Sequence, residues 1–352
     1  MATPSCIKVA MFAAPRSIES SVYLPIPGAL MLAPLSFVQP LDHGIHVIDT
    51  GFHRPMFDAS YLIVEYGRAA FVDTGTNDSV PRLLAALEAA GVPRDAVDYV
   101  IATHVHLDHA GGVGLLMQQL PAARLVVHPH GARHLIDPGR LMSSASGVYG
   151  EDEVLRSYGR VVAVPAARVL RTEDGMTLDF AGRPLTFLDT PGHARHHHCI
   201  WDARSRGWFT GDTFGLSYRE FDTAHGAWVM PTTTPVQFEP EALRRSVQRL
   251  LAYEPECLYL THYGRVTYAP RLGALLLGQM DEMVAVALSL TATLPAGRER
   301  HAAMMRGFCA IYMKHLREHG CTLAQARIDE LLALDLELNA QGMAVWLNRR
   351  QR

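Results

Sequence analysis

Apolar residues recur along residues 44–261 in short runs that alternate with helix-like stripes. Runs of β-branched, aromatic and leucine residues predict strands at 44–49, 60–65, 69–73, 98–103, 124–128, 168–171, 176–180, 184–188, 199–202, 207–210 and 257–261. An apolar stripe predicts a helix that begins at Asp78 and ends at Gly91, and similar stripes predict helices at 111–120 and 240–251. Strands that alternate with helices indicate a layered α/β domain.

The strand patterns end near residue 269. Residues 270–291, 298–319 and 322–346 are rich in Leu, Ala and Met and predict three helices. Near the N-terminus, three prolines interrupt the apolar stretch 22–38, whereas a membrane-spanning helix needs about 20 apolar residues without such breaks. We therefore expect a cytoplasmic protein without a membrane anchor. It would comprise an N-terminal extension (1–38), a main domain (39–269) and a C-terminal helical region (270–352).

Composition narrows the chemistry further. A formal charge of −3 gives no reason to expect a nucleic-acid partner, so we expect a small-molecule substrate and leave a homodimer open. The five cysteines are widely spaced and include no C-x-x-C pair, which argues against a disulfide framework or a thiolate zinc site. The unusual feature is the eighteen histidines, because histidine is the commonest metal ligand in proteins.

Several of these histidines follow predicted strands directly. An H-x-H-x-D-H motif occupies residues 104–109, and His193, Asp212 and His262 each come just after another strand. In α/β folds such positions lie on loops that the sheet holds in place. In extended backbone His104 and His106 point the same way and can reach one cation, while the next residues can serve a second.

The order of these motifs resembles the metallo-β-lactamase superfamily. The resemblance covers residues 41–268 and includes the early Asp73-Thr74-Gly75 and the His193 that follows T-P-G. It implies a four-layer αββα sandwich of the α/β class, here with a C-terminal helical extension. It also implies a metal site along the edge between the two sheets.

The resemblance further implies two metal sites that share one ligand. Site one would consist of His104, His106 and His193, site two of Asp108, His109 and His262, and Asp212 would bridge them. Asp73 and His197 would support these ligands by hydrogen bonds rather than bind metal. We expect two divalent ions, with zinc favoured and iron or manganese as alternatives, because nitrogen and oxygen ligands do not choose among them.

The resemblance does not identify a substrate. Zinc β-lactamases with a cysteine ligand carry Cys where this chain has Asp212, so penicillin hydrolysis is not expected. The carboxylate instead resembles the glyoxalase II, lactonase, phosphodiesterase and RNase Z branches, and the helical tail resembles glyoxalase II and a quinolone-signal thioesterase. We therefore expect a hydrolase of a small ester, thioester or lactone that uses a water activated between two metals, with Asp108 accepting its proton.

Two alternatives remain open. A phosphodiesterase would need cationic groups near the site, and Arg195, Arg219 and Arg265 follow ligand loops. A metal-bearing regulatory or binding protein would show only incidental turnover.

Loop positions suggest substrate contacts, and some conspicuous residues have structural interpretations. His53, Tyr218 and His225 lie in loops that could line the mouth of the site. The apolar C-terminal helices could cap that mouth. By contrast, we expect His196 and His198 to be exposed or to pack, and Met280, Met283 and Cys199 to be buried without a chemical role.

Overall fold

The computed structural model describes residues 35–233 and 236–350, apart from the side chains of residues 144, 145, 148, 149 and 153. The described residues belong to one compact unit. Most of the predicted N-terminal extension lies outside them.

The first sheet follows the chain order. Its strands are β1 (Val38–Pro40), β2 (Ile45–Asp49), β3 (Ala59–Glu65), β4 (Arg68–Val72), β5 (Val97–Ala102), β6 (Arg124–Val127) and β7 (Val169–Arg171). The pairs from β1 to β4 are antiparallel and those from β4 to β7 are parallel. Because β4 and β5 are parallel, their carboxyl ends meet at one edge of the sheet, where Asp73 and the histidine motif begin.

The second sheet has the order β13-β12-β11-β10-β9-β8. Its strands are β8 (Thr177–Phe180), β9 (Arg183–Asp189), β10 (His198–Asp202), β11 (Gly207–Gly211), β12 (Cys257–Leu260) and β13 (Gly264–Thr267). Only β11 and β12 pair in parallel, connected through α7 (Pro240–Leu251). Their carboxyl ends therefore lie together, just before Asp212 and His262.

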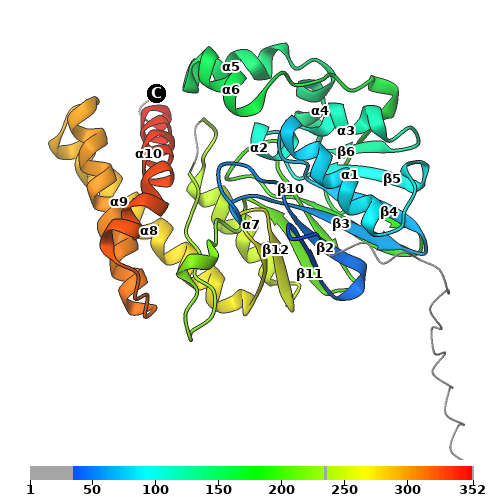
Figure 1. Cartoon of the computed structure of the whole chain (residues 1–352). Helices are drawn as coiled ribbons and strands as arrows, with labels where there is room; N and C mark the ends of the chain where they lie inside the picture. The colour runs from blue at the N-terminus through cyan, green and yellow to red at the C-terminus, as the bar shows by residue number, and fades with distance from the viewer. Residues whose placement is uncertain (1–34, 234–235, 351–352) are drawn as a thin grey trace, which may run out of the picture. The chain divides into compact units, whose positions relative to one another are not determined.

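The two sheets and their helices form the predicted αββα sandwich. Helices α1 (Val80–Ala89) and α3 (Val113–Gln119) cover the first sheet, and α7 covers the second (Figure 1). Between the sheets, side chains such as Tyr61 and Phe209 form a separate apolar layer, their ring centroids 5.2 Å apart. Apolar layers on both faces of each sheet explain why inner strands such as β6 and β12 are mostly hydrophobic.

Three long helices follow the last strand. They are α8 (Ala269–Thr293), α9 (Arg298–Glu318) and α10 (Gln325–Arg350), which pack on one another and on α7. Met280 and Met283 are fully buried there, as expected. By length and composition α8 could cross a membrane, but its buried face joins the core that includes Trp208 of the second sheet. The predicted boundary at residue 269 therefore separates strands from helices within a continuous core, and the division into a main domain and a C-terminal helical region stays a prediction.

Some elements differ from those the sequence predicts. The helix expected to begin at Asp78 begins at Val80, because residues 77–79 form a 3-10 turn in which Ser79 Oγ accepts a hydrogen bond from the Thr76 backbone N–H. Strand β13 follows the strand that we expected to be last. The edge strand β1 and the helices α4 (Pro129–Ile136), α5 (Gly139–Tyr149) and α6 (Glu151–Tyr158) were also not predicted.

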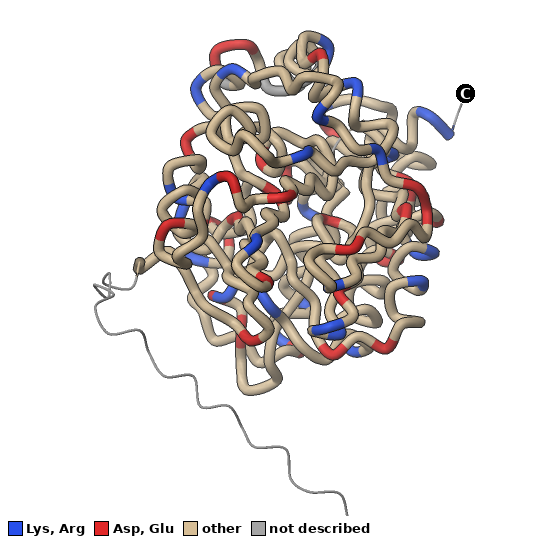
Figure 2. The backbone as a smooth tube through the Cα atoms, turned by 90° about the vertical axis from the view of Figure 1, so that its right-hand side faces the viewer, with Lys and Arg blue, Asp and Glu red and all other residues tan. Residues whose placement is uncertain are grey.

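Charged residues of both signs are interspersed along the backbone in the view of Figure 2. This distribution is compatible with the expectation that no nucleic acid binds, which stays a prediction.

Candidate metal centre

The first set of donors comes from the ends of β5, β9 and β11. Nε2 of His104 lies 2.9 Å from Nδ1 of His106, and that nitrogen lies 3.0 Å from Nε2 of His193. Oδ2 of Asp212 is 3.4 Å from the same His193 nitrogen. One donor atom from each of these four residues lies within 4.8 Å of every other.

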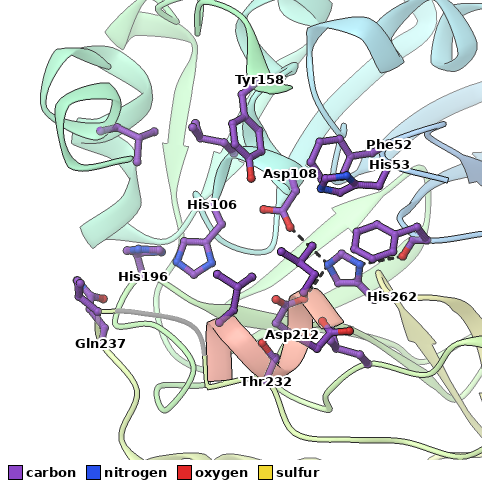
Figure 3. A pocket seen from close by; sticks show the side chains of 18 of the residues that line it. Phe52, His53, His106, Asp108, Tyr158, His196, Asp212, Thr232, Gln237 and His262 are labelled. Atoms are coloured by element: carbon purple, nitrogen blue, oxygen red, sulfur yellow. Dashed lines mark hydrogen bonds and ion pairs between the residues drawn. The ribbon is translucent and has the colours of Figure 1, made fainter. Parts of the chain in front are cut away.

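The second set comes from the helical turn α2 (Leu107–Ala110) and the end of β12. Oδ2 of Asp108 lies 3.6 Å from Nε2 of His109 and 3.5 Å from Nε2 of His262 (Figure 3). We predicted a loop at this position. The helical turn instead brings the adjacent residues Asp108 and His109 to one side of the motif, facing His262.

Asp212 faces both sets. Its Oδ2 points toward His193, while its Oδ1 lies 3.3 Å from Nε2 of His109 and 3.7 Å from Nε2 of His262. The residue is 5% exposed, so its carboxylate is almost fully enclosed by protein. The structure thus brings all seven predicted ligands together, with Asp212 in the position expected of a bridge.

These residues fit a pair of cations. Nε2 of His109 and Oδ1 of Asp212 are buried and have no hydrogen-bond partner among the described residues, although buried polar atoms normally have one. A tetrahedral ion with bonds of about 2.0–2.1 Å separates its ligand atoms by about 3.3 Å. The donor distances given above span 2.9 to 3.7 Å and are compatible with that geometry.

Burial keeps the histidines of the first set in the neutral form that binds metal. It lowers the pKa of His104 and of His193, and it lowers the pKa of His106 to about 3. These rings are therefore neutral at physiological pH and present a free lone pair, which is the form that binds metal.

In the second set, the effect of neighbouring charges on the pKa values outweighs that of burial. Burial by itself would raise the pKa of Asp108 and Asp212, but His109 and His262 hold both below the usual range. In return, and against the effect of burial, the two carboxylates raise the pKa of His109 and bring that of His262 to about 9. The negative charge that holds these protons is the charge that would attract a cation.

Asp73 connects three of the ligand-bearing segments. Its carboxylate accepts hydrogen bonds from the backbone N–H of Thr103 at 2.8 Å and from Thr261 Oγ1 at 3.0 Å, and it lies 3.2 Å from Nδ1 of His109. Asp73 also adopts a left-handed backbone with φ of 56°, a strain that is typical of functional sites. These contacts fit the supporting role predicted for this residue.

His197 supports Asp212 from behind. Its Nε2 accepts a hydrogen bond from the backbone N–H of Asp212 at 3.1 Å, and its Nδ1 lies 2.9 Å from Thr190 Oγ1. The preceding Gly211 has φ of 48°, and a Cβ there would come within 2.5 Å of Nε2 of His197. Only glycine leaves room for this ring directly behind the bridging carboxylate.

A pocket of about 220 Å³ opens onto both donor sets (Figure 3). His106, Asp108, Asp212 and His262 contribute to its lining. The other polar lining residues are His53, His134, Tyr158, His196, Tyr218, Thr232, Gln237 and Asp335. The apolar ones are Phe52, Phe57, Leu107, Leu141, Leu216, Val236, Leu334 and Leu338. The described lining includes no Lys or Arg.

The predicted substrate contacts separate into two groups. His53 and Tyr218 line the pocket. His225 does not, because its loop packs against the end of α9, where its ring lies 6.1 Å from that of His319. Its position therefore gives no support to the predicted contact.

His196 and His198, the two histidines that we expected to be exposed or to pack, are both buried. His198 packs 5.1 Å from the ring of Phe187, whereas His196 also faces the pocket. Cys199 is fully buried, as predicted.

Several pocket residues could not be found from the sequence. Leu334, Asp335 and Leu338 come from α10, one of the C-terminal helices that we expected could cap the mouth, but the individual residues carried no signal of their own. Phe52 and Phe57 follow β2, in the loop that also contains His53, and carried no signal of their own.

Comparison with known proteins agrees with this geometry. The family model of the metallo-beta-lactamase superfamily matches residues 47–262. The metallo-beta-lactamase fold-containing protein ST1585 of Sulfurisphaera tokodaii is 26% identical over 228 residues, which are 64% of this chain and 80% of that protein. Its crystal structure matches 78% of this chain and 99% of its own with a TM-score of 0.57 at 24% identity, which shows a shared fold.

Two further relatives have names that state an activity. A hydroxyacylglutathione hydrolase of Synechococcus is 31% identical over 145 residues, 41% of this chain and 43% of that protein. The acyl-coenzyme A thioesterase MBLAC2 of Bos taurus is 31% identical over 120 residues, 32% of this chain and 39% of that protein. The chain thus spans less than half the length of these two relatives.

Proposed function

Because the chain belongs to the metallo-beta-lactamase superfamily and gathers seven ligand side chains beneath a pocket, we propose that it is a metal-dependent hydrolase of acyl thioesters. Small esters and lactones are included because they present the same acyl carbon. The observation that carries the proposal is the position of Asp212, whose two oxygens face two separate donor sets.

The chain's own residues would hold the metal ions, orient the metal ligands and accept the proton of the attacking water. Two divalent ions held by the two sets would supply an activated water and polarise the acyl oxygen. Asp108 lines the pocket, so its carboxylate can hold that water and accept its proton. The backbone oxygen of Phe57 lies 2.8 Å from Nδ1 of His262 and fixes the ring with Nε2 toward the site.

The pocket lining supports acyl rather than phosphoryl substrates. Apolar side chains from several elements surround the donor sets, and the described lining offers no cation to a phosphodiester. The arginines considered for that role are not among the described lining residues: Arg219, for example, hydrogen-bonds the backbone oxygen of Ser217 and pairs with Asp222. The names of the thioesterase and hydroxyacylglutathione hydrolase relatives favour a thioester.

A substrate panel tests the proposal. Protein loaded separately with zinc, manganese or iron would be given an acyl thioester, a p-nitrophenyl ester, a lactone and bis(p-nitrophenyl)phosphate. We expect the thioester to be cleaved fastest, with loss of activity in His262→Ala and full activity in His225→Ala, a histidine outside the pocket. Preference for the phosphodiester would contradict the proposal. Turnover of none of the substrates would favour a regulatory or binding protein.

A further inference from the structure

The pocket contains a carboxyl group that the proposed hydrolysis does not use. Asp335 lies on α10, the salmon helix of Figure 3, between the lining residues Leu334 and Leu338. It is 6% exposed, and the Tyr218 hydroxyl donates a hydrogen bond to its Oδ2 at 3.0 Å. Two residues that are 117 positions apart thus form one polar spot beside the apolar lining residues Leu334 and Leu338.

The Tyr218 side of this pair is held firmly. The Tyr218 ring stacks on Phe57 with centroids 5.5 Å apart, and the Arg54 guanidinium lies 4.5 Å from the Tyr218 ring centroid. Phe57 in turn contacts the ring of His262 edge-on at 5.3 Å. The Phe57 ring therefore lies between the Tyr218 ring and a predicted metal ligand, and Tyr218, Asp335 and His262 all line the same pocket.

The pair has unused hydrogen-bonding capacity. No described residue hydrogen-bonds Oδ1 of Asp335, and the hydroxyl oxygen of Tyr218 can still accept a hydrogen bond. Burial raises the pKa of Tyr218, so its hydroxyl stays protonated and continues to hold Oδ2. A polar group with an open acceptor in an apolar wall costs free energy unless a ligand pairs with it.

We propose, on the basis of the proposed function, that Tyr218 and Asp335 bind a hydroxyl or amide N–H group on the acyl chain of the substrate. The preferred substrates are then neutral acyl thioesters or esters that carry such a donor close to the scissile carbonyl. A simple alkyl chain fits the apolar walls but leaves Asp335 without a partner. An acidic group on the chain would face Asp335 with no Lys or Arg in the described lining to neutralise it.

The test compares three thioesters of equal chain length: plain acyl, 3-hydroxyacyl and N-acylglycyl. The metal-loaded wild type should cleave at least one donor-bearing substrate with kcat/KM about 10- to 100-fold above that of the plain one. Calorimetry with uncleavable thioether analogues should give the same order of affinities. Because the analogues do not react, this readout is independent of turnover.

Variants separate recognition from a purely structural role. Asp335→Leu and Tyr218→Phe should lower kcat/KM for the donor-bearing substrate by about 10-fold or more relative to that for the plain thioester, so that the preference disappears. Glu337→Gln on the same helix, whose side chain pairs with His301, should keep the preference. Equal losses on all substrates would instead show that the pair only anchors α10, and would overturn the inference.

Two further outcomes distinguish failure of the inference from failure of the proposed function. If the wild type cleaves all three thioesters equally, the inference fails and the proposed hydrolase function stands. If it cleaves none with any metal, the proposed function fails and the inference fails with it.

Discussion

At the scale of single residues, the site depends on side chains that orient its ligands. His197 holds the backbone N–H of Asp212 without being among the predicted metal ligands. We expect His197→Ala to fold but to bind zinc about 10- to 100-fold more weakly, as is usual when such a support is removed. Competition with a zinc-binding dye measures this, and the exposed His130→Ala is the matched control. Unchanged affinity in His197→Ala would show that Asp212 needs no such support.

Asp335 provides a second prediction at this scale. Burial raises the pKa of Asp335 to about 7, above its ordinary 3.8, and the neighbouring Tyr218, His262 and Arg54 offset this only in part. The native state then binds the proton more tightly, so the free energy of unfolding falls as the pH rises from about 4 to about 7. At about 1.4 kcal/mol per pKa unit the loss reaches at most about 4 kcal/mol.

Asp335→Asn removes this loss because the amide stays neutral. We expect the metal-free variant to have a higher Tm than the metal-free wild type at pH 8, and the difference to shrink at pH 5. Thermal unfolding followed by circular dichroism measures both. A variant that is less stable than the wild type at pH 8 would contradict the raised pKa.

At the scale of elements, the C-terminal helices belong to the core and to the pocket. Helix α8 buries Leu276 and Met280 in the same cluster as Trp208 of β11 and Leu243 of α7. A chain that ends at residue 268 would expose this cluster. Each large apolar side chain left unburied costs about 1.5–3 kcal/mol, against a total stability of about 5–15 kcal/mol.

We therefore expect the shortened chain to lose cooperative thermal unfolding and to be poorly soluble. Circular dichroism and sedimentation of the purified fragment measure this. A soluble fragment with a sharp transition would contradict the shared core and would show that the predicted main domain folds without the C-terminal helices.

The sequence predicted those elements that local patterns specify. Strand ends could be located because β-branched runs stop at Asp73, His104 and His262, and the H-x-H-x-D-H spacing indicated the ligands before any fold was known. Other features depend on packing between distant segments. The apolar composition of the C-terminal helices suggested that they could cap the mouth of the site, but the contact of Asp335 with Tyr218 leaves no trace in either local sequence. Short elements such as β13 and α2 are set by their neighbours rather than by propensity.

At the scale of the whole molecule, metal binding and stability should be coupled. The donors come from β5, α2, β9, β11 and β12, so a bound cation would connect both sheets. A ligand that binds only the folded state adds about 2.7 kcal/mol at 100 times its Kd. We expect a chelator to lower Tm by several degrees and zinc to restore it, whereas calcium, which prefers oxygen ligands, should not. A Tm that is indifferent to chelator would contradict this coupling.

The most direct test of the account is the metal content of the purified chain, because the proposed chemistry requires two cations that share Asp212. Elemental analysis after reconstitution should find two equivalents of zinc, manganese or iron per wild-type chain, and markedly less than two in Asp212→Ala. A wild-type chain that stays metal-free with all three metals, or an Asp212→Ala chain that keeps both equivalents, would contradict it.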